Sequence, residues 1–195
     1  SRFLKSIMEF DIDIEKSVEA LKNGELILYP TDTVWGIGCD ATNTAAVEKI
    51  YALKKRADEK AMIVLLADER DILKYVAAPD LQIFDYLENA TKPTTVIYEG
   101  AIGFADNLVG ADGSIAIRIC DEDFCKHLLK RFRKPIVSTS ANISNEPTAK
   151  IYKEITQEIK DGVDYIVNYR QDDERIAQPS SVIKWNNGKV EILRP

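Results

Sequence analysis

The sequence predicts an α/β fold, in which one twisted, open, mixed sheet is flanked by helices. Short apolar runs typical of buried strands alternate along the chain with segments whose apolar residues recur at helical spacing. The C-terminal residues form two strand-like segments joined by Asn186, Asn187 and Gly188, which is a β-hairpin signal. The 195 residues, 45% of them hydrophobic, contain no repeat or linker, so we expect a single domain over residues 1–195.

The first predicted elements are a helix, a strand and a second helix. Residues 13–23 carry apolar side chains three and four positions apart and are followed by a glycine, which predicts a helix and its end. Residues 25–29 contain the apolar run "LILY", and this strand should end at Pro30, which cannot donate a hydrogen bond to a neighbouring strand. Asn43 or Thr44 can cap the second helix, whose buried face includes four apolar positions.

Two further strands enclose two short helices. The run "AMIVLLA" predicts a strand over 61–67, and the β-branched run "TTVIY" predicts one over 94–98. Between them, Asp68 caps a short helix that ends near Val76, and a second short helix covers 80–88.

The same alternation continues to the C-terminus. A loop with four glycines should cover residues 99–113, and period-two alternation predicts that a strand follows it. The later elements are a strand over 114–119, an amphipathic helix over 121–132, a strand over 135–140, a helix over 152–160, a strand over 163–169 and the terminal hairpin.

Composition and charge exclude several classes of protein. The formal net charge is −6, whereas a protein built mainly to bind nucleic-acid phosphates is usually basic. His127 is the single histidine, so metal sites built on several histidines are excluded. Cys39, Cys120 and Cys125 are odd in number and lack C-x-x-C spacing, which disfavours a disulfide framework and a zinc site and fits a reducing cytoplasm. No apolar run approaches the ~18 residues needed to span a membrane.

Small polar side chains gather where three predicted strands end. They occupy residues 31–33, 138–142 and 180–181, and Gly36 and Gly38 after the first group allow a ligand to approach the backbone closely. Ligands of open α/β sheets bind at the carboxyl ends of strands, so we expect a small-molecule site there. An ordinary strand-to-helix loop has a similar composition, and that alternative stays open.

Several cations accompany these hydroxyl groups. Arg118 lies inside an apolar strand, where a charged residue needs a partner or a ligand. Lys54 and Arg56 end a helix and lead into Lys60, and Arg194 follows the last strand. Each also has a structural alternative, because helix C-termini favour cations and a buried arginine can pair with a structural carboxylate.

The chain lacks an evident activated nucleophile. A Ser-His-Asp arrangement would have to use His127, which lies in the basic segment "CKHLLKRFRK". There is no G-x-x-x-x-G-K-[ST] phosphate loop and no G-x-G-x-x-G run. Cations and hydroxyl donors without a nucleophile suit a phosphate-bearing substrate, and the chemistry would then be phosphoryl or nucleotidyl transfer by positioning and charge stabilisation.

Six segments together resemble the YrdC-type threonylcarbamoyl-AMP synthases and occur in that family's order. They cover about residues 15–195 and read "LILYPTDTVWGIGCDATN", "IYALKKRADEKAMIVLL", "SIAIRI", "IVSTSANIS", "PSSVI" and "ILRP". The resemblance implies a YrdC-like domain of the short, single-domain form. It also implies that L-threonine, bicarbonate and ATP are condensed to threonylcarbamoyl-AMP with release of pyrophosphate, for threonylcarbamoyladenosine modification of tRNA.

The resemblance also implies which residues bind the substrates. The four matched to L-threonine are Thr33, Arg118, Ser140 and Ser180. The six matched to ATP are Lys54, Arg56, Lys60, Ser114, Asn142 and Arg194, and Thr148 is a less certain match on the ATP side. No protein nucleophile and no protein metal ligand is implied; Lys54 and Arg56 would stabilise charge, and Mg²⁺ would assist.

The chain departs from the family pattern in three loops. Ala57 and Ala61 stand where prolines are frequent, Lys92 replaces a glycine, and Asn145 replaces the glycine after "SANIS". These departures affect the loop shapes more than the phosphate-binding cations.

The implied partners are a tRNA threonylcarbamoyltransferase complex, which receives the product transiently, and tRNA by a weak contact; no membrane is implied. One alternative is an RNA-binding module without catalytic activity, in which "KHLLKRFRK" and "KKR" would contact phosphates. A second is a carbamoyl-adenylate enzyme that uses another amine, which we rank low because the zinc-binding cysteine motifs of such relatives are missing.

Overall fold

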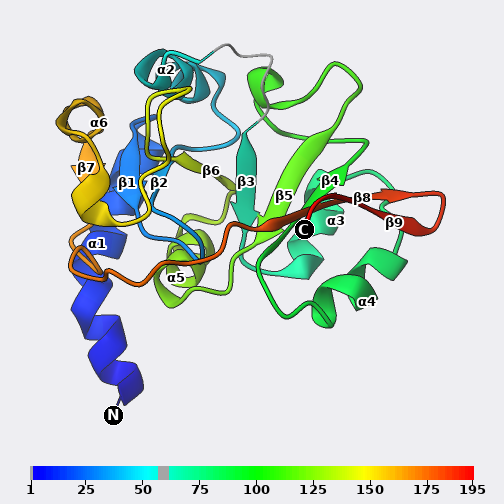
Figure 1. Ribbon diagram of the computed structural model, residues 1–195, viewed down its shortest axis with the longest axis horizontal. Coiled ribbons are helices and arrows are strands. Elements are labelled where there is room, and N and C mark those ends of the chain that lie inside the picture. Colours follow the sequence, from blue (N-terminus) through cyan, green and yellow to red (C-terminus); the bar gives the residue numbers. More distant parts are fainter. Residues whose placement is uncertain (1, 57–61) are drawn as a thin grey trace.

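The computed structural model describes the backbone of residues 2–56 and 62–195 and the side chains of 9–56 and 62–195. Within these residues, nine strands form one open mixed sheet in the order β7-β1-β2-β6-β3-β5-β4-β8-β9 (Figure 1). The strands are β1 (Ile27–Tyr29), β2 (Gly36–Gly38), β3 (Ile63–Leu66), β4 (Thr94–Tyr98), β5 (Ile115–Ile119), β6 (Ile136–Ser140), β7 (Tyr165–Ile166), β8 (Ser181–Asn186) and β9 (Lys189–Arg194).

Helices flank this sheet, with α2 at the top of the view in Figure 1 and α1, α5 and α4 at the bottom. The α-helices are α1 (Arg2–Lys22), α2 (Thr44–Lys54), α3 (Ile72–Tyr75), α4 (Gln82–Glu88), α5 (Asp123–Phe132) and α6 (Gln157–Gly162). Three 3₁₀ turns complete the elements of the described residues: η1 (Glu69–Asp71), η2 (Asp106–Leu108) and η3 (Tyr152–Glu154). None of the helices in this part of the chain is long and apolar enough to cross a membrane.

The sheet is mixed, as the alternating pattern predicts. Strand pairs β1–β7, β3–β5 and β4–β8 are parallel, and the remaining neighbours are antiparallel. The register places Arg118 on β5 opposite Thr95 on β4 and Leu65 on β3, and places Ser140 at the end of β6 opposite Gly36 on β2. Polar residues from distant parts of the chain are thereby brought to neighbouring strands.

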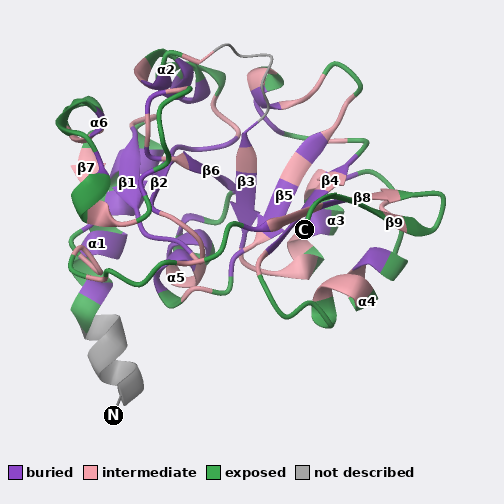
Figure 2. Ribbon diagram, in the orientation of Figure 1, coloured by how far each residue is buried: buried purple, intermediate pink, exposed green. Residues whose placement is uncertain are grey.

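The core lies around the central strands, which are largely buried in Figure 2. A close contact within it explains β2, a strand that lies where the sequence pattern predicts a loop. A Cβ on Gly38 would lie 2.6 Å from Tyr29 Cε1 and 2.8 Å from the Val137 carbonyl oxygen, so only glycine fits between β1 and β6. That glycine accommodates neighbouring strands, which corrects the expectation that it leaves room for a ligand.

The C-terminal elements differ from the prediction in their extent. The expected helix over 152–160 divides into η3 and α6, and the expected strand over 163–169 shortens to β7. The buried carboxylate of Asp13 accounts for the early end of β7, because it accepts hydrogen bonds from the backbone N–H groups of Asn168 and Tyr169 at 3.0 Å each. Those donors are therefore not available to a neighbouring strand.

Helix α1 begins well before the predicted residue 13, and its backbone leaves the helical region at Phe10, with φ −121° and ψ 15°. The Phe10 ring packs edge-on against Phe124 of α5, with centroids 5.6 Å apart. This contact fixes α1 on α5. The short helix predicted from Asp68 to Val76 divides into the 3₁₀ turn η1 and the four-residue helix α3. The remaining predicted strands and helices are confirmed within two or three residues at their ends.

Candidate functional site

A cavity of about 310 Å³ opens where β2, β3, β5 and β6 approach one another. All four residues that the sequence matched to threonine line it, namely Thr33, Arg118, Ser140 and Ser180. Three residues from the ATP side also line it: Arg56, Arg194 and Thr148. The structure therefore brings together side chains from five distant segments, although their individual roles stay predictions.

Arg118 is the most deeply buried charge of this cavity, with 3% of its surface exposed. Its Nη2 lies 3.0 Å from Asp32 Oδ1 and 3.3 Å from Thr33 Oγ1, and its Nε donates to the same Asp32 oxygen at 3.1 Å. Within the described residues Nη1 has no hydrogen-bond partner, which leaves donors for a ligand. The pairing with a structural carboxylate and the position in the cavity coexist, so the two sequence interpretations of Arg118 are not exclusive.

In the loop after β1, the Thr31 hydroxyl stabilises the loop and the Thr33 hydroxyl faces the cavity. Thr31 Oγ1 donates to the Val34 carbonyl oxygen at 2.7 Å and accepts from the Thr33 N–H at 3.1 Å, so it shapes the loop itself. Thr33 faces the cavity and contacts Arg118. Sequence reasoning named the whole run but did not separate the residue that shapes the loop from the one that lines the site.

Ser180 and Arg194 form a second polar group on the cavity wall. Ser180 Oγ lies 2.9 Å from Thr95 Oγ1, and Arg194 donates from Nη2 to Ser180 Oγ at 3.1 Å and from Nε to the Ser180 carbonyl oxygen at 2.9 Å. A residue matched to threonine is therefore joined directly to one matched to ATP. The two predicted subsites share a wall.

Lys54 lies behind Ser140, at the end of β6, and does not line the cavity. Its side chain is 2% exposed, and its ammonium group donates to the Ser140 carbonyl oxygen and lies 3.4 Å from Ser140 Oγ. Burial, and secondarily the charge of Arg56, lower its pKa from 10.5 to about 8. Burial also lowers the pKa of Arg56, whose Nη1 donates to Thr139 Oγ1 at 3.4 Å. The two cations thus flank the end of β6 in a poorly hydrated setting.

Like Lys54, two further described residues matched to ATP, Ser114 and Asn142, do not line the cavity. The Ser114 N–H binds Asp112 Oδ1 at 3.1 Å in a turn before β5. The Asn142 amide donates to the carbonyl oxygens of Ile143 and Glu146 at 3.0 Å each, while its buried Oδ1 has no partner within the described residues. Lys60 lies outside the described residues. Their roles stay predictions.

Two wall residues were missed by the sequence analysis. Trp35 packs its ring against Tyr152, with centroids 4.9 Å apart, and Met62 directly precedes β3. Together with Ile63 they give the polar site an apolar side. The position of Trp35 directly after the hydroxyl-rich loop was the signal that could have identified it.

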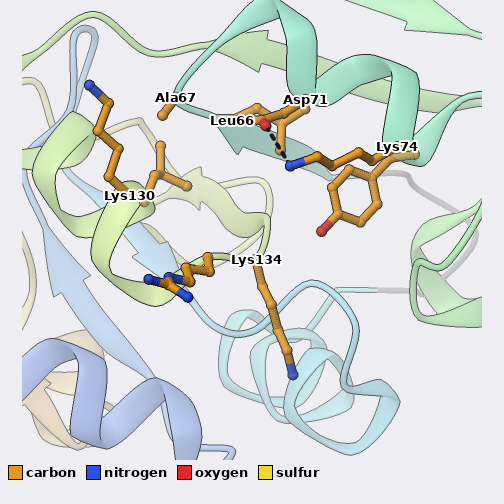
Figure 3. A pocket seen from close by; sticks show the side chains of 9 residues that line it. Leu66, Ala67, Asp71, Lys74, Lys130 and Lys134 are labelled. Carbon is orange, nitrogen blue, oxygen red and sulfur yellow. Dashed lines mark hydrogen bonds and ion pairs between the residues drawn. The ribbon is translucent and has the colours of Figure 1, made fainter.

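A second cavity, of about 340 Å³, lies between α3 and the end of α5 (Figure 3). Its cations are Lys74, Lys130, Arg133 and Lys134. Lys74 pairs with Asp71 at 3.2 Å and Lys134 with Asp40 at 3.4 Å, and the carboxyl end of α5 adds negative partial charge. No residue matched to a substrate lines it, so the cavity around Arg118 is the better candidate.

The site holds cations, hydroxyl groups and an apolar side, but its chemistry does not include an evident nucleophile. His127 lies on α5, where its Nδ1 is 2.8 Å from the Asp123 carbonyl oxygen, and it does not line this cavity. The Cys39 thiol is buried, and burial raises its pKa far above the ordinary value. Such a site suits the binding of anionic substrates and the stabilisation of charge.

Within the described parts of the chain, no three His, Cys, Asp or Glu side chains are grouped in a way that could hold a metal ion. The buried, unpartnered Asn142 Oδ1 is an amide oxygen of the kind that Mg²⁺ or its bound water contacts. One such oxygen fits an ion that a phosphate-bearing substrate and water would mainly hold.

The Sua5/YciO/YrdC family profile, described as "Telomere recombination", matches residues 19–195. A threonylcarbamoyl-AMP synthase of Pseudoalteromonas translucida (strain TAC 125) is 33% identical over 183 residues, which cover 91% of this chain and 95% of that protein. One of Idiomarina loihiensis is 33% identical over 179 residues, which cover 90% and 95%. Both likenesses extend over nearly the whole of each protein.

Solved structures show the same fold. P. abyssi Sua5 complexed with L-threonine has a TM-score of 0.85 and 22% identity over 93% of this chain and 53% of its own. E. coli YciO has a TM-score of 0.77 and 22% identity over 93% and 87%. The chain therefore spans about half the length of the P. abyssi protein and most of the E. coli one. The predicted fold class is confirmed.

Proposed function

The chain belongs to the Sua5/YciO/YrdC family, and from that premise we propose that it is a threonylcarbamoyl-AMP synthase. It condenses L-threonine, bicarbonate and ATP to threonylcarbamoyl-AMP and releases pyrophosphate, so it is a nucleotidyltransferase. The product serves the modification of tRNA through a transient hand-over to a threonylcarbamoyltransferase complex. We further propose a single YrdC-like domain over residues 1–195 and a cytoplasmic location.

The observation that carries this proposal is the convergence of the threonine-matched residues around a buried guanidinium group. Arg118 keeps Nη1 for a ligand while Asp32 and Thr33 hold its other nitrogens in place. An arginine fixed in this way suits the α-carboxylate of an amino acid, because the planar guanidinium matches carboxylate geometry. Ser140 and Ser180 offer hydroxyl groups on the neighbouring walls for the rest of the substrate.

The proposed reaction needs no protein nucleophile. The threonine amine and bicarbonate give a carbamate and water, and a carbamate oxygen then attacks the α-phosphorus of ATP. The bond from this phosphorus to the bridging oxygen breaks, and pyrophosphate leaves with the electron pair. Lys54 and Arg56 offset the charge that develops at phosphorus, and Mg²⁺, when bound with ATP, supplies further charge neutralisation.

No observation favours the alternative of an RNA-binding module without catalytic activity. The basic segment that suggested it contributes Lys130 and Arg133 to the second cavity, on another part of the molecule from Arg118. A weak contact with tRNA remains a proposal alongside the enzyme activity.

Pyrophosphate release tests the proposed function. We expect release from ATP and Mg²⁺ only when L-threonine and bicarbonate are both present, and we expect an adenylate product of threonine to accumulate. Arg56→Ala should reduce release about a hundredfold, because it removes a cation beside the reacting phosphates. Arg131→Ala, a matched loss of charge at an exposed position of α5, should have no effect. Release that does not depend on threonine would refute the proposal.

The lowered pKa of Lys54 makes ATP binding pH-dependent. Below pH 8 the ammonium group is charged and attracts phosphate, whereas at pH 9 only about a tenth of the free protein retains that charge. We expect the dissociation constant of a non-hydrolysable ATP analogue, measured by calorimetry, to rise about tenfold between pH 7.5 and pH 9. Lys54→Arg should flatten this profile, since arginine stays charged; an unchanged profile in that variant would show that another group titrates.

A further inference from the structure

The segment between β7 and β8 crosses the molecule and delivers Ser180 to the cavity (Figure 1). Near its start, Arg170 adopts a left-handed backbone conformation with φ 65°. A quarter of its side chain is exposed. A non-glycine residue is uncommon in this conformation, and here the side chain is held by contacts with other parts of the fold.

The Arg170 guanidinium group joins three parts of the fold. Nη1 donates to the Thr31 carbonyl oxygen at 3.1 Å and lies 3.4 Å from Glu122 Oε1, while Nε donates to Asp173 Oδ2 at 3.2 Å. It therefore links the loop after β1, the start of α5 and the crossing segment. These contacts span sequence separations of about fifty to 140 residues, apart from the local one to Asp173.

Glu122, the residue that Arg170 contacts at the start of α5, is itself held in place by the helix. Glu122 caps this helix by accepting from the backbone N–H groups of Phe124 at 3.2 Å and Cys125 at 2.8 Å. Its carboxylate is mostly buried, so the position of the Arg170 guanidinium is set by a helix that is packed into the core. A fixed anchor of this kind can restrain the loop that it contacts.

The loop after β1 is thereby held between two arginines. Arg118 binds the Asp32 carboxylate, and Arg170 binds the carbonyl oxygen of the preceding residue, Thr31. Thr33, which lines the cavity, directly follows Asp32 in the chain. Any shift of this loop moves the Thr33 hydroxyl and the carboxylate that orients Arg118 at the same time.

We propose that Arg170 is a positioning residue of the threonine subsite, which holds the 31–33 loop so that Thr33 and Arg118 meet the threonine carboxylate. The inference rests on the proposed function. It assigns a task to a residue that does not line the cavity and that no sequence motif indicated. The predicted signature is selective: threonine binding depends on Arg170, whereas ATP binding does not.

Arg170→Asn is the test variant, because asparagine tolerates a left-handed backbone but cannot reach all three partners. Arg175→Asn is the matched control. Arg175 binds the same Asp173 carboxylate at 2.8 Å and 3.0 Å, yet in the described residues its hydrogen bonds all go to Asp173. Both variants remove one positive charge from one segment, and only the first removes the contact with Thr31.

Calorimetry with L-threonine and with an ATP analogue, together with thermal unfolding, gives the readouts. We expect Arg170→Asn to weaken threonine binding at least tenfold and ATP-analogue binding less than twofold, because a displaced loop spoils the geometry of only one subsite. Arg175→Asn should leave both affinities unchanged. Amide hydrogen exchange at Thr33, whose N–H is bound to Thr31 Oγ1, should quicken in Arg170→Asn alone.

Threonine affinity that is unchanged in Arg170→Asn would overturn the inference while leaving the proposed function intact. Equal losses for threonine and ATP, with a lowered melting temperature, would overturn it in favour of a general structural role. If the unmodified protein itself binds no threonine, the proposed function fails and the inference falls with it. Guanidinium chloride at low millimolar concentration should partly restore threonine binding to Arg170→Gly, a rescue that general destabilisation would not produce.

Discussion

Replacing Lys54 with methionine is expected to reduce pyrophosphate release strongly and to make the fold more stable. The two effects have one cause, which is a charged group held in a site with little water. The pKa of Lys54 falls from 10.5 to about 8 on folding, which corresponds to about 3 kcal/mol of unfavourable free energy at neutral pH. Methionine has a similar volume and carries no charge into the core.

The hydrogen bond from Lys54 to the Ser140 carbonyl oxygen returns part of this free energy. That oxygen also accepts from the Asn142 N–H at 2.9 Å, so methionine does not leave it without a partner. A net stabilisation of about 1–2 kcal/mol is therefore expected, which raises the melting temperature by a few degrees in a chain of this size. Activity should fall at least about a hundredfold, as for other groups that stabilise transition-state charge.

The stability difference has a defined pH dependence. The folded pKa of Lys54 lies below the unfolded value, so the unfavourable contribution is complete below about pH 8 and disappears as the pH rises from about 8 to 10.5. The advantage of the Lys54→Met variant in denaturant unfolding should shrink over that window. Lys55→Met is the control, because Lys55 is exposed and pairs only with exposed Glu158 among the described residues. A Lys54→Met variant that is less stable than the unmodified protein at pH 7 would contradict this account.

The main strands and helices could be predicted because hydrophobic spacing reports which face of a segment is buried. Strand β2 could not, since "GIG" has low strand propensity. It forms because β1 and β6 lie on its two sides and leave no room for a Cβ at Gly38. Strand β7 was overestimated for a comparable reason, because Asp13, a residue of α1, takes the backbone donors that would have extended it.

The types of residue in the candidate site could be predicted from the sequence, but the long-range contacts between them could not. Hydroxyl groups at the ends of strands indicated where to expect a ligand. Thr33 and Ser140 do line one cavity, and the register of β2 and β6 places Ser140 opposite Gly36. Sequence gave no sign that Lys54 lies behind Ser140 or that Arg170 reaches Thr31, because both contacts are set by long-range packing. Such contacts leave no local pattern in the chain.

Replacing Arg118 with methionine is expected to eliminate threonine binding and to destabilise the protein. The substitution removes the proposed partner of the threonine carboxylate. It also leaves Asp32, whose side chain is 13% exposed, without the guanidinium group that offsets its charge. Breaking one side of a buried ion pair costs about 3–5 kcal/mol, and the partial exposure of Asp32 favours the lower end of that range.

A second substitution separates the two effects. Asp32→Asn removes the uncompensated charge, so the double variant Arg118→Met/Asp32→Asn should regain much of the lost stability, which thermal unfolding would show. Calorimetry should still detect no threonine binding, because no guanidinium group is restored. Asp32→Asn alone leaves Arg118 charged but less firmly oriented, so it should weaken threonine binding without eliminating it. Threonine binding by the double variant would mean that the carboxylate is recognised elsewhere; a double variant no more stable than Arg118→Met would mean that packing, and not the ion pair, determines the cost.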